Sequence, residues 1–248
     1  MRVEFQDKVV LVTGGSRGMG KAMVEAFAAR GASVVIASRK IDACETLAAA
    51  VREKHGGTAL PVACNVSSWS DCDALVETVY GEFGRVDVLV NNAGLSPLYP
   101  SLDEVSEALF DKVIGVNLRG PFRLGSAIGT RMAAGDGGAI INVSSIAAIR
   151  PGAHELPYAA AKAGLNALTE GMAKAFGPTV RVNCIQAGPF RTDISLAWSE
   201  ETKARFEQSL ALRRCGEPEE IVGAALYFAS DAASFCTGAV LRLDGGTP

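Results

Sequence analysis

The sequence predicts a doubly wound α/β fold, in which a mostly parallel sheet carries helices on both faces. Short runs of Val, Ile, Leu and Ala alternate along the chain with longer segments of helical periodicity. The apolar runs are nearly continuous, which is typical of strands buried on both faces of a parallel sheet. We therefore expect strands linked by right-handed helical crossovers, with ligands bound beyond the carboxyl ends of the strands.

The expected elements alternate regularly from one end of the chain to the other. The expected strands span 9–12, 34–37, 58–63, 86–90, 139–143, 180–185 and 239–243. The expected helices span 19–27, 42–54, 70–83, 103–131, 157–176, 197–210 and 218–230. No linker, repeat or low-complexity tract interrupts this order, so we expect one domain over 1–248, with a substrate lid around 190–212.

Composition excludes several classes of function. The 248 residues include 24 basic and 27 acidic side chains, and 48% are apolar, which is enough for a sizeable core. Without a run of Lys and Arg, neither nucleic acid nor an anionic membrane surface is expected as a partner. No apolar run approaches the roughly 18 residues of a membrane helix. A small-molecule ligand remains.

The cysteines and the N-terminus point to a reducing compartment. Six cysteines occur without a C-x-x-C motif, and only two histidines accompany them, so no metal site is expected. The first residues are charged and lack the apolar core of a signal peptide. We expect a cytoplasmic protein.

A glycine-rich segment follows the first expected strand and opens the first expected helix. Residues 13–20 read T-G-G-S-R-G-M-G, with Gly14, Gly18 and Gly20 spaced for a tight turn. Glycines let the backbone approach a pyrophosphate, and the helix N-terminus supplies free amides and positive charge. In this context a Rossmann dinucleotide site is expected, and a plain turn is the alternative.

The end of the second expected strand bears on the choice of coenzyme. A fold that prefers NAD(H) places a carboxylate there for the ribose 2′-hydroxyl, whereas this chain has Ser38, Arg39 and Lys40. Arg39 can pair with a 2′-phosphate, and Arg17 can approach the same group. We therefore expect NADP(H) in preference to NAD(H). The alternative is that both arginines are solvated surface charges.

Tyr158 and Lys162 lie four residues apart near the start of an expected helix, on one face of it. Making a tyrosine a proton carrier near pH 7 requires about 4 kcal/mol, which a unit charge at about 4 Å can supply at an effective dielectric of 20. A pair of this kind alone is usually an exposed contact. Pro121 should free the carbonyl of Asn117 and bend its helix, because proline has no N–H; a purely structural kink is the alternative.

These motifs resemble the short-chain dehydrogenase/reductase family. The glycine spacing, N-N-A-G at 91–94, the Tyr158/Lys162 pair and the segment D-G-G at 244–246 carry the resemblance along the whole chain. It implies a catalytic serine thirteen residues before Tyr158, which selects Ser145 over Ser144, with the reverse left open. It also implies that Asn117 is the fourth catalytic residue.

With the loop arguments above, the resemblance assigns the coenzyme site. Its expected residues are Gly14, Ser16, Arg17, Gly18, Met19, Gly20, Ser38, Arg39, Lys40, Asn65, Val66, Asn91, Ala93, Gly94, Tyr158, Lys162, Gly188, Phe190 and Thr192. Two positions depart from the family pattern. Asn65 stands where Asp is usual, and Ala187 stands where the family has Pro before Gly188.

The resemblance implies reversible hydride transfer between nicotinamide and a carbonyl or secondary alcohol, with Tyr158 as general acid and base. We expect 95–99, 146–156 and 190–210 to wall the substrate pocket, with Trp198 and Phe206 on the lid and His154 as a further candidate contact. Because the loop 133–138 has no basic residue, a small or sugar-like substrate is favoured over a carrier-bound acyl chain. The alternative is a 3-oxoacyl-(acyl-carrier-protein) reductase.

Two other classes remain open, a catalytically silent nucleotide sensor and a structural assembly subunit. Tyr158, Lys162 and Ser145 together count against the sensor. Relatives that resemble this chain commonly form tetramers, so we expect a homotetramer through the helices near 103–131 and 157–176.

Overall fold

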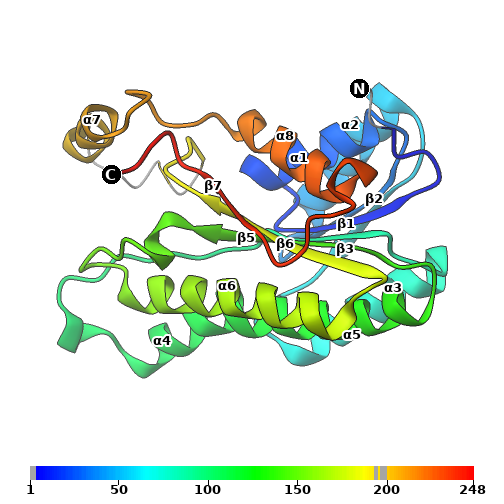
Figure 1. The fold of residues 1–248 in the computed structure, drawn as a ribbon, viewed down its shortest axis with the longest axis horizontal. Coiled ribbons are helices and arrows are strands. Elements are labelled where there is room, and N and C mark those ends of the chain that lie inside the picture. The colour runs from blue at the N-terminus through cyan, green and yellow to red at the C-terminus, as the bar shows by residue number, and fades with distance from the viewer. Residues whose placement is uncertain (1–3, 193–194, 196–199) are drawn as a thin grey trace.

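The computed structural model describes residues 4–192, 195 and 200–248, and these contain a seven-stranded parallel sheet between two layers of helices (Figure 1). The strands are β1 (Val9–Thr13), β2 (Ser33–Ser38), β3 (Ala59–Ala63), β4 (Val88–Asn91), β5 (Gly138–Ser145), β6 (Val180–Ala187) and β7 (Val240–Leu243). The helices are α1 (Gly18–Ala28), α2 (Ile41–His55), α3 (Trp69–Phe83), α4 (Glu107–Ile114), α5 (Gly120–Ala134), α6 (Leu156–Phe176), α7 (Glu200–Ser209) and α8 (Val222–Ala229). The predicted fold class is confirmed.

The two faces of the sheet explain the continuous apolar strands. Along β1, Val10 and Val12 pack in a core with α1, α2 and α8, whereas Val9 and Leu11 pack in a second core with α3, α5 and α6. Figure 1 shows the same division, with α1, α2 and α8 above the sheet and α3, α5 and α6 below it. Because alternate side chains enter different cores, these four consecutive residues of the strand are all apolar.

The strand order places a ligand site near the middle of the sheet. The order is β3-β2-β1-β4-β5-β6-β7, so the chain crosses from one side of β1 to the other between β3 and β4. The loops after β1 and β4 therefore diverge from adjacent strands, which leaves a crevice at the carboxyl edge. Among the described residues, no helix is both long and apolar enough to cross a membrane.

The long helix expected over 103–131 is interrupted in the structure. A short 3-10 turn at 102–104 precedes α4, and a π-helical turn, Gly115–Arg119, separates α4 from α5. The strands β5 and β6 both run further than expected, because the polar residues Ser144 and Gln186 pair with each other beyond the apolar run. Apolar patterning alone does not detect such polar strand ends.

Candidate active site

The loop after β1 brings the N-terminus of α1 to the carboxyl edge of the sheet. Gly18, the first residue of the helix, has φ of +52°, a left-handed conformation that favours glycine. A Cβ atom on Gly20 would overlap the carbonyl oxygen of Gly14. Arg17 provides no side-chain cap, so the first amides of α1 are not occupied by that side chain. The predicted residues in this loop and first turn are Gly14, Ser16, Arg17, Gly18, Met19 and Gly20.

The loops after β1 and β4 are joined by a set of hydrogen bonds. The Thr13 hydroxyl accepts from the N–H groups of Asn92 at 3.1 Å and Ala93 at 3.2 Å. The Asn92 carboxamide donates to the carbonyl oxygens of Thr13 at 3.0 Å and Gly14 at 3.2 Å. Asn92 therefore fixes the glycine loop against β4, a role that the sequence analysis did not assign to it.

Asn91 begins a buried chain of polar side chains that links two strands to α6. Its Nδ2 donates to Asn142 Oδ1 at 3.0 Å, and Asn142 Nδ2 donates to Thr169 Oγ1 at 2.9 Å. Thr169 in turn donates to the carbonyl oxygen of Leu165. The chain ties the end of β4 and the middle of β5 to the helix that carries Tyr158. The sequence signal for this buried chain was Asn142, a polar residue inside an otherwise apolar strand.

The residues expected to select the coenzyme lie after β2, next to the glycine loop. Arg39, Lys40 and Arg17 are exposed, and β1 and β2 are paired neighbours, so the two loops leave the same edge of the sheet. The Ser38 hydroxyl lies 3.0 Å from Cys44 Sγ and so contacts the start of α2. Three positive charges thus stand around this corner of the crevice.

The loop after β3 holds Asn65 and Val66. The Asn65 side-chain oxygen accepts from the N–H of Ser67 at 3.3 Å and from its hydroxyl at 2.8 Å. Val66 is buried against α5, where a Cβ atom on Gly120 would overlap its carbonyl oxygen. The Asn65 oxygen therefore stabilises its own turn, and its amide nitrogen is the group left to face a ligand.

Helix α6 carries Tyr158 and Lys162 on one face, with Pro157 in its first turn. The Lys162 Nζ lies 5.6 Å from the centroid of the Tyr158 ring and donates to the Val143 carbonyl oxygen at 2.7 Å. The Ser144 hydroxyl donates to the carbonyl oxygen of Lys162 at 3.1 Å. The Ser145 hydroxyl instead accepts from the Ala147 N–H at 3.2 Å and lies near enough to the Tyr158 phenol to lower its pKa. The two adjacent serines thus contact different parts of α6.

Burial dominates the ionisation of the pair. It raises the pKa of Tyr158 to about 12, although the nearby Ser145 hydroxyl opposes the shift, and the charge of Glu155 adds to it. Burial also lowers the pKa of Lys162 to about 8. In the protein alone the tyrosine pKa therefore moves opposite to the expectation. The sequence argument counted the lysine charge but not the desolvation of the phenol.

Asn117 lies in the π-helical turn between α4 and α5, just before Pro121. Its Oδ1 accepts from the N–H of Leu95 at 3.2 Å, and its Nδ2 donates to the carbonyl oxygens of Leu95 at 2.8 Å and Val113 at 2.9 Å. A Cβ atom built on Gly94 would lie 3.4 Å from Asn117 Oδ1 and 3.8 Å from Lys162 Nζ. Asn117, Gly94 and Lys162 therefore converge beneath the crevice.

The segment after β6 crosses to the glycine loop. A Cβ atom built on Gly18 would lie 3.4 Å from Thr192 Cγ2. The Thr192 N–H donates to Ser195 Oγ at 3.1 Å, and that hydroxyl donates back to the Thr192 carbonyl oxygen at 2.7 Å. Gly188 packs against Asp244, where a Cβ atom would come within 2.5 Å of Cα. Despite Ala187, this segment reaches the helix start opposite.

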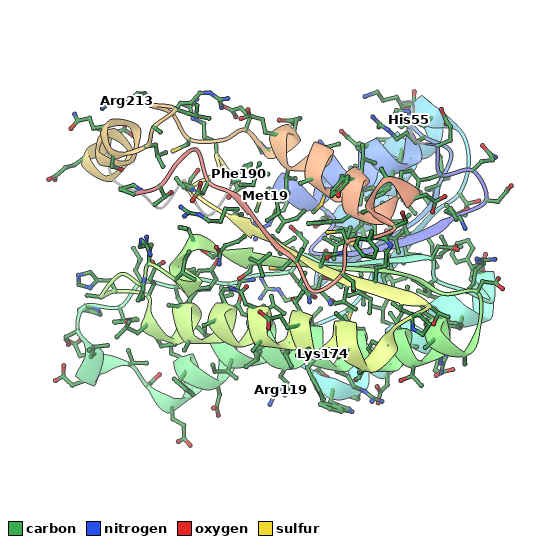
Figure 2. All side chains as sticks on the ribbon, viewed as in Figure 1. Met19, His55, Arg119, Lys174, Phe190 and Arg213 are labelled. Carbon is green, nitrogen blue, oxygen red and sulfur yellow. The ribbon has the colours of Figure 1, made fainter. Side chains whose placement is uncertain are left out.

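In Figure 2 the labels of Phe190 and Met19 lie close together, below the segment that joins α7 to α8. Phe190 is buried, and both side chains belong to the core that includes α1 and α8. The Phe190 backbone pairs with Gly216, and the ring lies so close that a Cβ atom on Gly216 would be 2.9 Å from it. Phe190 and Met19 therefore belong to the apolar packing on the α1 and α8 side of the sheet.

Comparisons with known proteins agree with this geometry. A family model described as enoyl-(acyl carrier protein) reductase matches residues 14–248. An L-rhamnose 1-dehydrogenase (NAD(P)(+)) of Azotobacter vinelandii is 40% identical, with 97% of this chain and 96% of that protein covered. The 3-oxoacyl-(acyl-carrier-protein) reductase FabG of Chlamydia trachomatis is 37% identical, with 97% of each chain covered. The human dehydrogenase/reductase SDR family member 4 is 34% identical, over 100% of this chain and 90% of that protein.

A solved structure gives the same result. A short-chain type dehydrogenase/reductase from Mycobacterium marinum superposes with a TM-score of 0.91 at 32% identity, covering 98% of this chain and 96% of the other. This chain belongs to the short-chain dehydrogenase/reductase family. The resemblance in the sequence is thus confirmed. The chain is an NAD(P)-dependent enzyme of the class that acts on alcohol and carbonyl groups.

In this short-chain dehydrogenase/reductase, a narrow hollow, too tight to hold a water molecule in this structure, lies beside Tyr158. Its walls come from the segment after β4, from α4 and from the start of α6. The residues that line it are Pro97, Tyr99, Leu109, Val113, Glu155, Pro157 and Tyr158. Residues from two of the three segments predicted to wall the substrate pocket, 95–99 and 146–156, therefore lie beside Tyr158. Sequence reasoning included Glu155 in a wall but gave it no role.

Less of the third predicted wall is described. Trp198 and the side chain of Phe206 lie outside what the structure describes, so the expected lid stays a prediction for them. The backbone of α7 is described at Glu200–Ser209. His154 is exposed, with its ring centroid 6.4 Å from that of Tyr99.

A larger cavity of about 430 Å³ lies at the opposite, amino edge of the sheet. Its walls include Asp136 and Gly137, which belong to the loop before β5, and Gly138, at which β5 begins. Ser145 lies at the other end of β5, about 23 Å from Gly138 at about 3.3 Å per residue. The argument from the missing basic residues of 133–138 was therefore wrong, because this loop does not border the entrance beside the Tyr158 of its own chain.

Proposed function

We propose that this chain is an NADP(H)-dependent oxidoreductase that transfers a hydride between nicotinamide and a carbonyl or secondary alcohol, with Tyr158 as general acid and base. The observation that carries the proposal is the placement of the Tyr158 ring 5.6 Å from the buried Lys162 Nζ on the same helix, with Ser145 near enough to lower the pKa of the phenol. A hydroxyl and a phenol that share one side of the crevice can both contact one substrate oxygen.

The residues present fit a dinucleotide. The glycine loop holds a helix N-terminus open at the carboxyl edge, Thr192 faces Gly18, and basic side chains stand beside the end of β2. Gly14 to Gly20 would hold the pyrophosphate, Ser38 to Lys40 the adenosine ribose, Asn65 and Val66 the adenine, and Asn91 to Gly94 the wall beneath it. Gly188 to Thr192 and Lys162 would hold the nicotinamide half. When bound, the coenzyme supplies or accepts the hydride.

In reduction Tyr158 donates its proton to the carbonyl oxygen, and in oxidation it takes the proton of the alcohol. Ser145 donates a hydrogen bond to that oxygen and stabilises the charge that develops on it. The Asn117 carbonyl holds a water molecule through which Lys162 exchanges protons with solvent. Lys162, whose pKa is about 8, is mainly charged at pH 7 and can bind ribose hydroxyls.

The raised pKa of Tyr158 determines how strongly nearby positive charges must stabilise its phenolate. Bringing the Tyr158 pKa from about 12 to about 7 requires about 7 kcal/mol. A full charge at about 4 Å contributes up to about 4 kcal/mol at an effective dielectric of 20. Lys162 alone is therefore not sufficient, and the positive charge of an oxidised nicotinamide ring is needed for the remainder.

The test of this proposal is NADPH oxidation with a panel of small ketones and one 3-oxoacyl thioester. Tyr158→Phe should lower kcat/KM by about 10²- to 10⁴-fold, because it removes the proton donor and keeps the ring. Tyr227→Phe, which removes an exposed phenol from α8, is the matched control and should keep full activity. Tight NADPH binding with no turnover would support the sensor instead, and absence of NADPH binding would support the structural subunit.

Coenzyme choice is tested by the ratio of dissociation constants for NADPH and NADH. Arg39→Ala should reduce the preference for NADPH about tenfold or more, because a charged hydrogen bond to the 2′-phosphate is lost. Lys54→Ala removes one exposed positive charge from the far end of α2 and should leave the ratio unchanged. An unchanged ratio in Arg39→Ala would contradict the assignment to NADP(H).

The comparisons give the substrate question two specific candidates. The similarity to FabG favours a 3-oxoacyl-(acyl-carrier-protein) substrate, and the similarity to the rhamnose dehydrogenase favours a sugar or another polyol. We place the small or sugar-like substrate first. The described cysteines are all free thiols, which agrees with the cytoplasm as the compartment.

A homotetramer belongs to the same proposal. The α4–α5 side of the molecule exposes Phe110 and Phe122, and the α8–β7 side exposes Tyr227 and Leu241. Two separate apolar faces suit an assembly with two kinds of interface. Light scattering coupled to gel filtration should give four times the chain mass of 25.8 kDa, and the mass of one chain would contradict it.

A further inference from the structure

Glu155 lies at the residue before α6, three positions before Tyr158, and its side chain lines the hollow beside that tyrosine. Its backbone is fixed from both sides. The Tyr99 hydroxyl donates to the Ala153 carbonyl oxygen at 3.0 Å and accepts from the Leu156 N–H at 2.8 Å. The first turn of α6 adds a hydrogen bond from the Ala159 N–H to the Glu155 carbonyl oxygen. The backbone of Glu155 is thus held in place next to the first turn of α6.

The carboxylate has few partners where it lies. It accepts one long hydrogen bond, from the Gly152 N–H at 3.4 Å, and no basic side chain forms an ion pair with it among the described residues. Burial raises its pKa, and that single hydrogen bond only partly opposes the shift. A carboxylate can accept about four hydrogen bonds, so most of its acceptor capacity is unused.

Apart from Tyr158, the other residues that line the hollow cannot donate hydrogen bonds to the Glu155 carboxylate. Pro97, Leu109, Val113 and Pro157 are apolar there. The Tyr99 hydroxyl already donates and accepts. A substrate group that approaches Tyr158 from this side therefore meets one free acceptor, the Glu155 carboxylate, on an otherwise apolar surface. Placing an apolar group there would desolvate the carboxylate without replacing its hydrogen bonds.

We propose that Glu155 is a specificity-determining residue that accepts a hydrogen bond from a second hydroxyl group of the substrate, next to the carbon that Tyr158 serves. The inference rests on the proposed function. Glu155 is the N-cap residue of α6, three positions before Tyr158, and both residues line the same hollow, so oxygens on adjacent carbons of one substrate suit the two groups. The substrate class it selects is therefore hydroxy-ketones, polyols and sugars rather than a plain ketone or an acyl chain.

The experiment uses substrate pairs that differ by one hydroxyl. NADPH-dependent reduction is measured with acetoin and butanone, and NADP-dependent oxidation with trans-cyclohexane-1,2-diol and cyclohexanol. The full-length protein should prefer the hydroxylated member of each pair about tenfold or more in kcat/KM, mainly through KM. Glu155→Leu should bring the ratio to within about threefold of one, whereas Glu155→Gln, which keeps an acceptor oxygen, should retain part of it. Glu53→Gln, an exposed glutamate on α2, should leave the ratio unchanged.

Any other outcome of this experiment would contradict either the role of Glu155 or the proposed function. A wild-type ratio near one, or an equal loss of both substrates in Glu155→Leu, would overturn the role of Glu155 and leave hydride transfer intact. Turnover of the 3-oxoacyl thioester alone would do the same, because that substrate lacks the second hydroxyl. No turnover of any substrate by the wild-type protein would overturn the proposed function itself, and this inference with it. Thermal melting of each variant separates a specificity change from loss of folding.

Discussion

The Lys162 ammonium donates a hydrogen bond to the Val143 carbonyl oxygen across 2.7 Å, although the lysine residue is only 3% exposed. One backbone acceptor replaces only part of the hydration that the ammonium loses, and burial consequently lowers its pKa to about 8. The protein therefore keeps a partly compensated charge at the centre of the site. The burial of Lys162 thus destabilises both the folded chain and the charged form of the lysine. Such burial is typical of residues that take part in catalysis or binding.

The first prediction concerns stability and pH. The folded pKa of Lys162 is about 8 and the ordinary value is 10.5, so between these pH values the unfolded chain binds more protons and folded stability rises with pH. Below this window the charge costs about 3 kcal/mol. Lys162→Met should therefore stabilise the protein at pH 7 by about 2 kcal/mol, after the loss of the hydrogen bond to Val143.

This gain should shrink as the pH rises from 8 to 10.5. The check is urea denaturation of wild type and variant across the range, in which titrations common to both proteins cancel in the difference. A stability difference that stays constant with pH would show that Lys162 is not destabilised by burial.

The second prediction separates the two serines at the end of β5. Ser145→Ala should lower kcat/KM by about 10²-fold with little change in melting temperature, because it removes a donor to the substrate oxygen. Ser144→Ala should instead cost about 1 kcal/mol of stability and spare most of the activity, because its hydroxyl holds the Lys162 carbonyl. Steady-state kinetics and thermal melting of both variants test the assignment, and the reverse pattern would exchange the roles of the two residues.

The fold was predictable because each strand and helix of this chain carries a strong local signal. The apolar pairs of β1 fill two cores at once, and Gly18 and Gly20 stand where a strand turns directly into a helix. At the π-helical turn around Asn117 the only signal was Pro121, which predicted a freed carbonyl and a bend, because the apolar spacing continues that of the flanking helices. The polar ends of β5 and β6 were missed for the opposite reason, since Ser144 and Gln186 interrupt the apolar pattern while the backbone pairing continues.

The grouping of the predicted site residues in space followed from the sequence, but their electrostatics did not. Tyr158, Lys162 and Ser145 could be placed on one edge from their spacing. The degree of burial could not be, and it decides the direction of the Tyr158 pKa shift. Glu155 had no distinguishing pattern either, because its significance depends on Tyr99 and on α4, which are distant in the sequence.

The third prediction concerns the buried polar chain behind the site. Thr169→Val removes the acceptor of Asn142 Nδ2 and leaves a buried amide unsatisfied, so it should cost about 1 to 3 kcal/mol. Thr78→Val is the matched control, because the exposed Thr78 hydroxyl donates only to the Ala74 carbonyl oxygen of its own helix and should cost much less. Chemical denaturation of both variants gives the comparison, and equal losses would show that the buried chain contributes nothing specific.

The last prediction tests the glycine loop with two substitutions of the same size. A Cβ atom on Gly20 would overlap the Gly14 carbonyl oxygen and lie 2.6 Å from Asn92 Nδ2, so Gly20→Ala must displace the loop. We expect NADPH affinity to fall at least about tenfold, since the amides of α1 move with the loop.

Gly223→Ala is the control, because nothing lies within 4 Å of that position in α8. It should stabilise the protein by about 0.5 to 1 kcal/mol and leave affinity unchanged. Calorimetric titration and thermal melting measure both effects, and wild-type affinity in Gly20→Ala would exclude this loop as the pyrophosphate site.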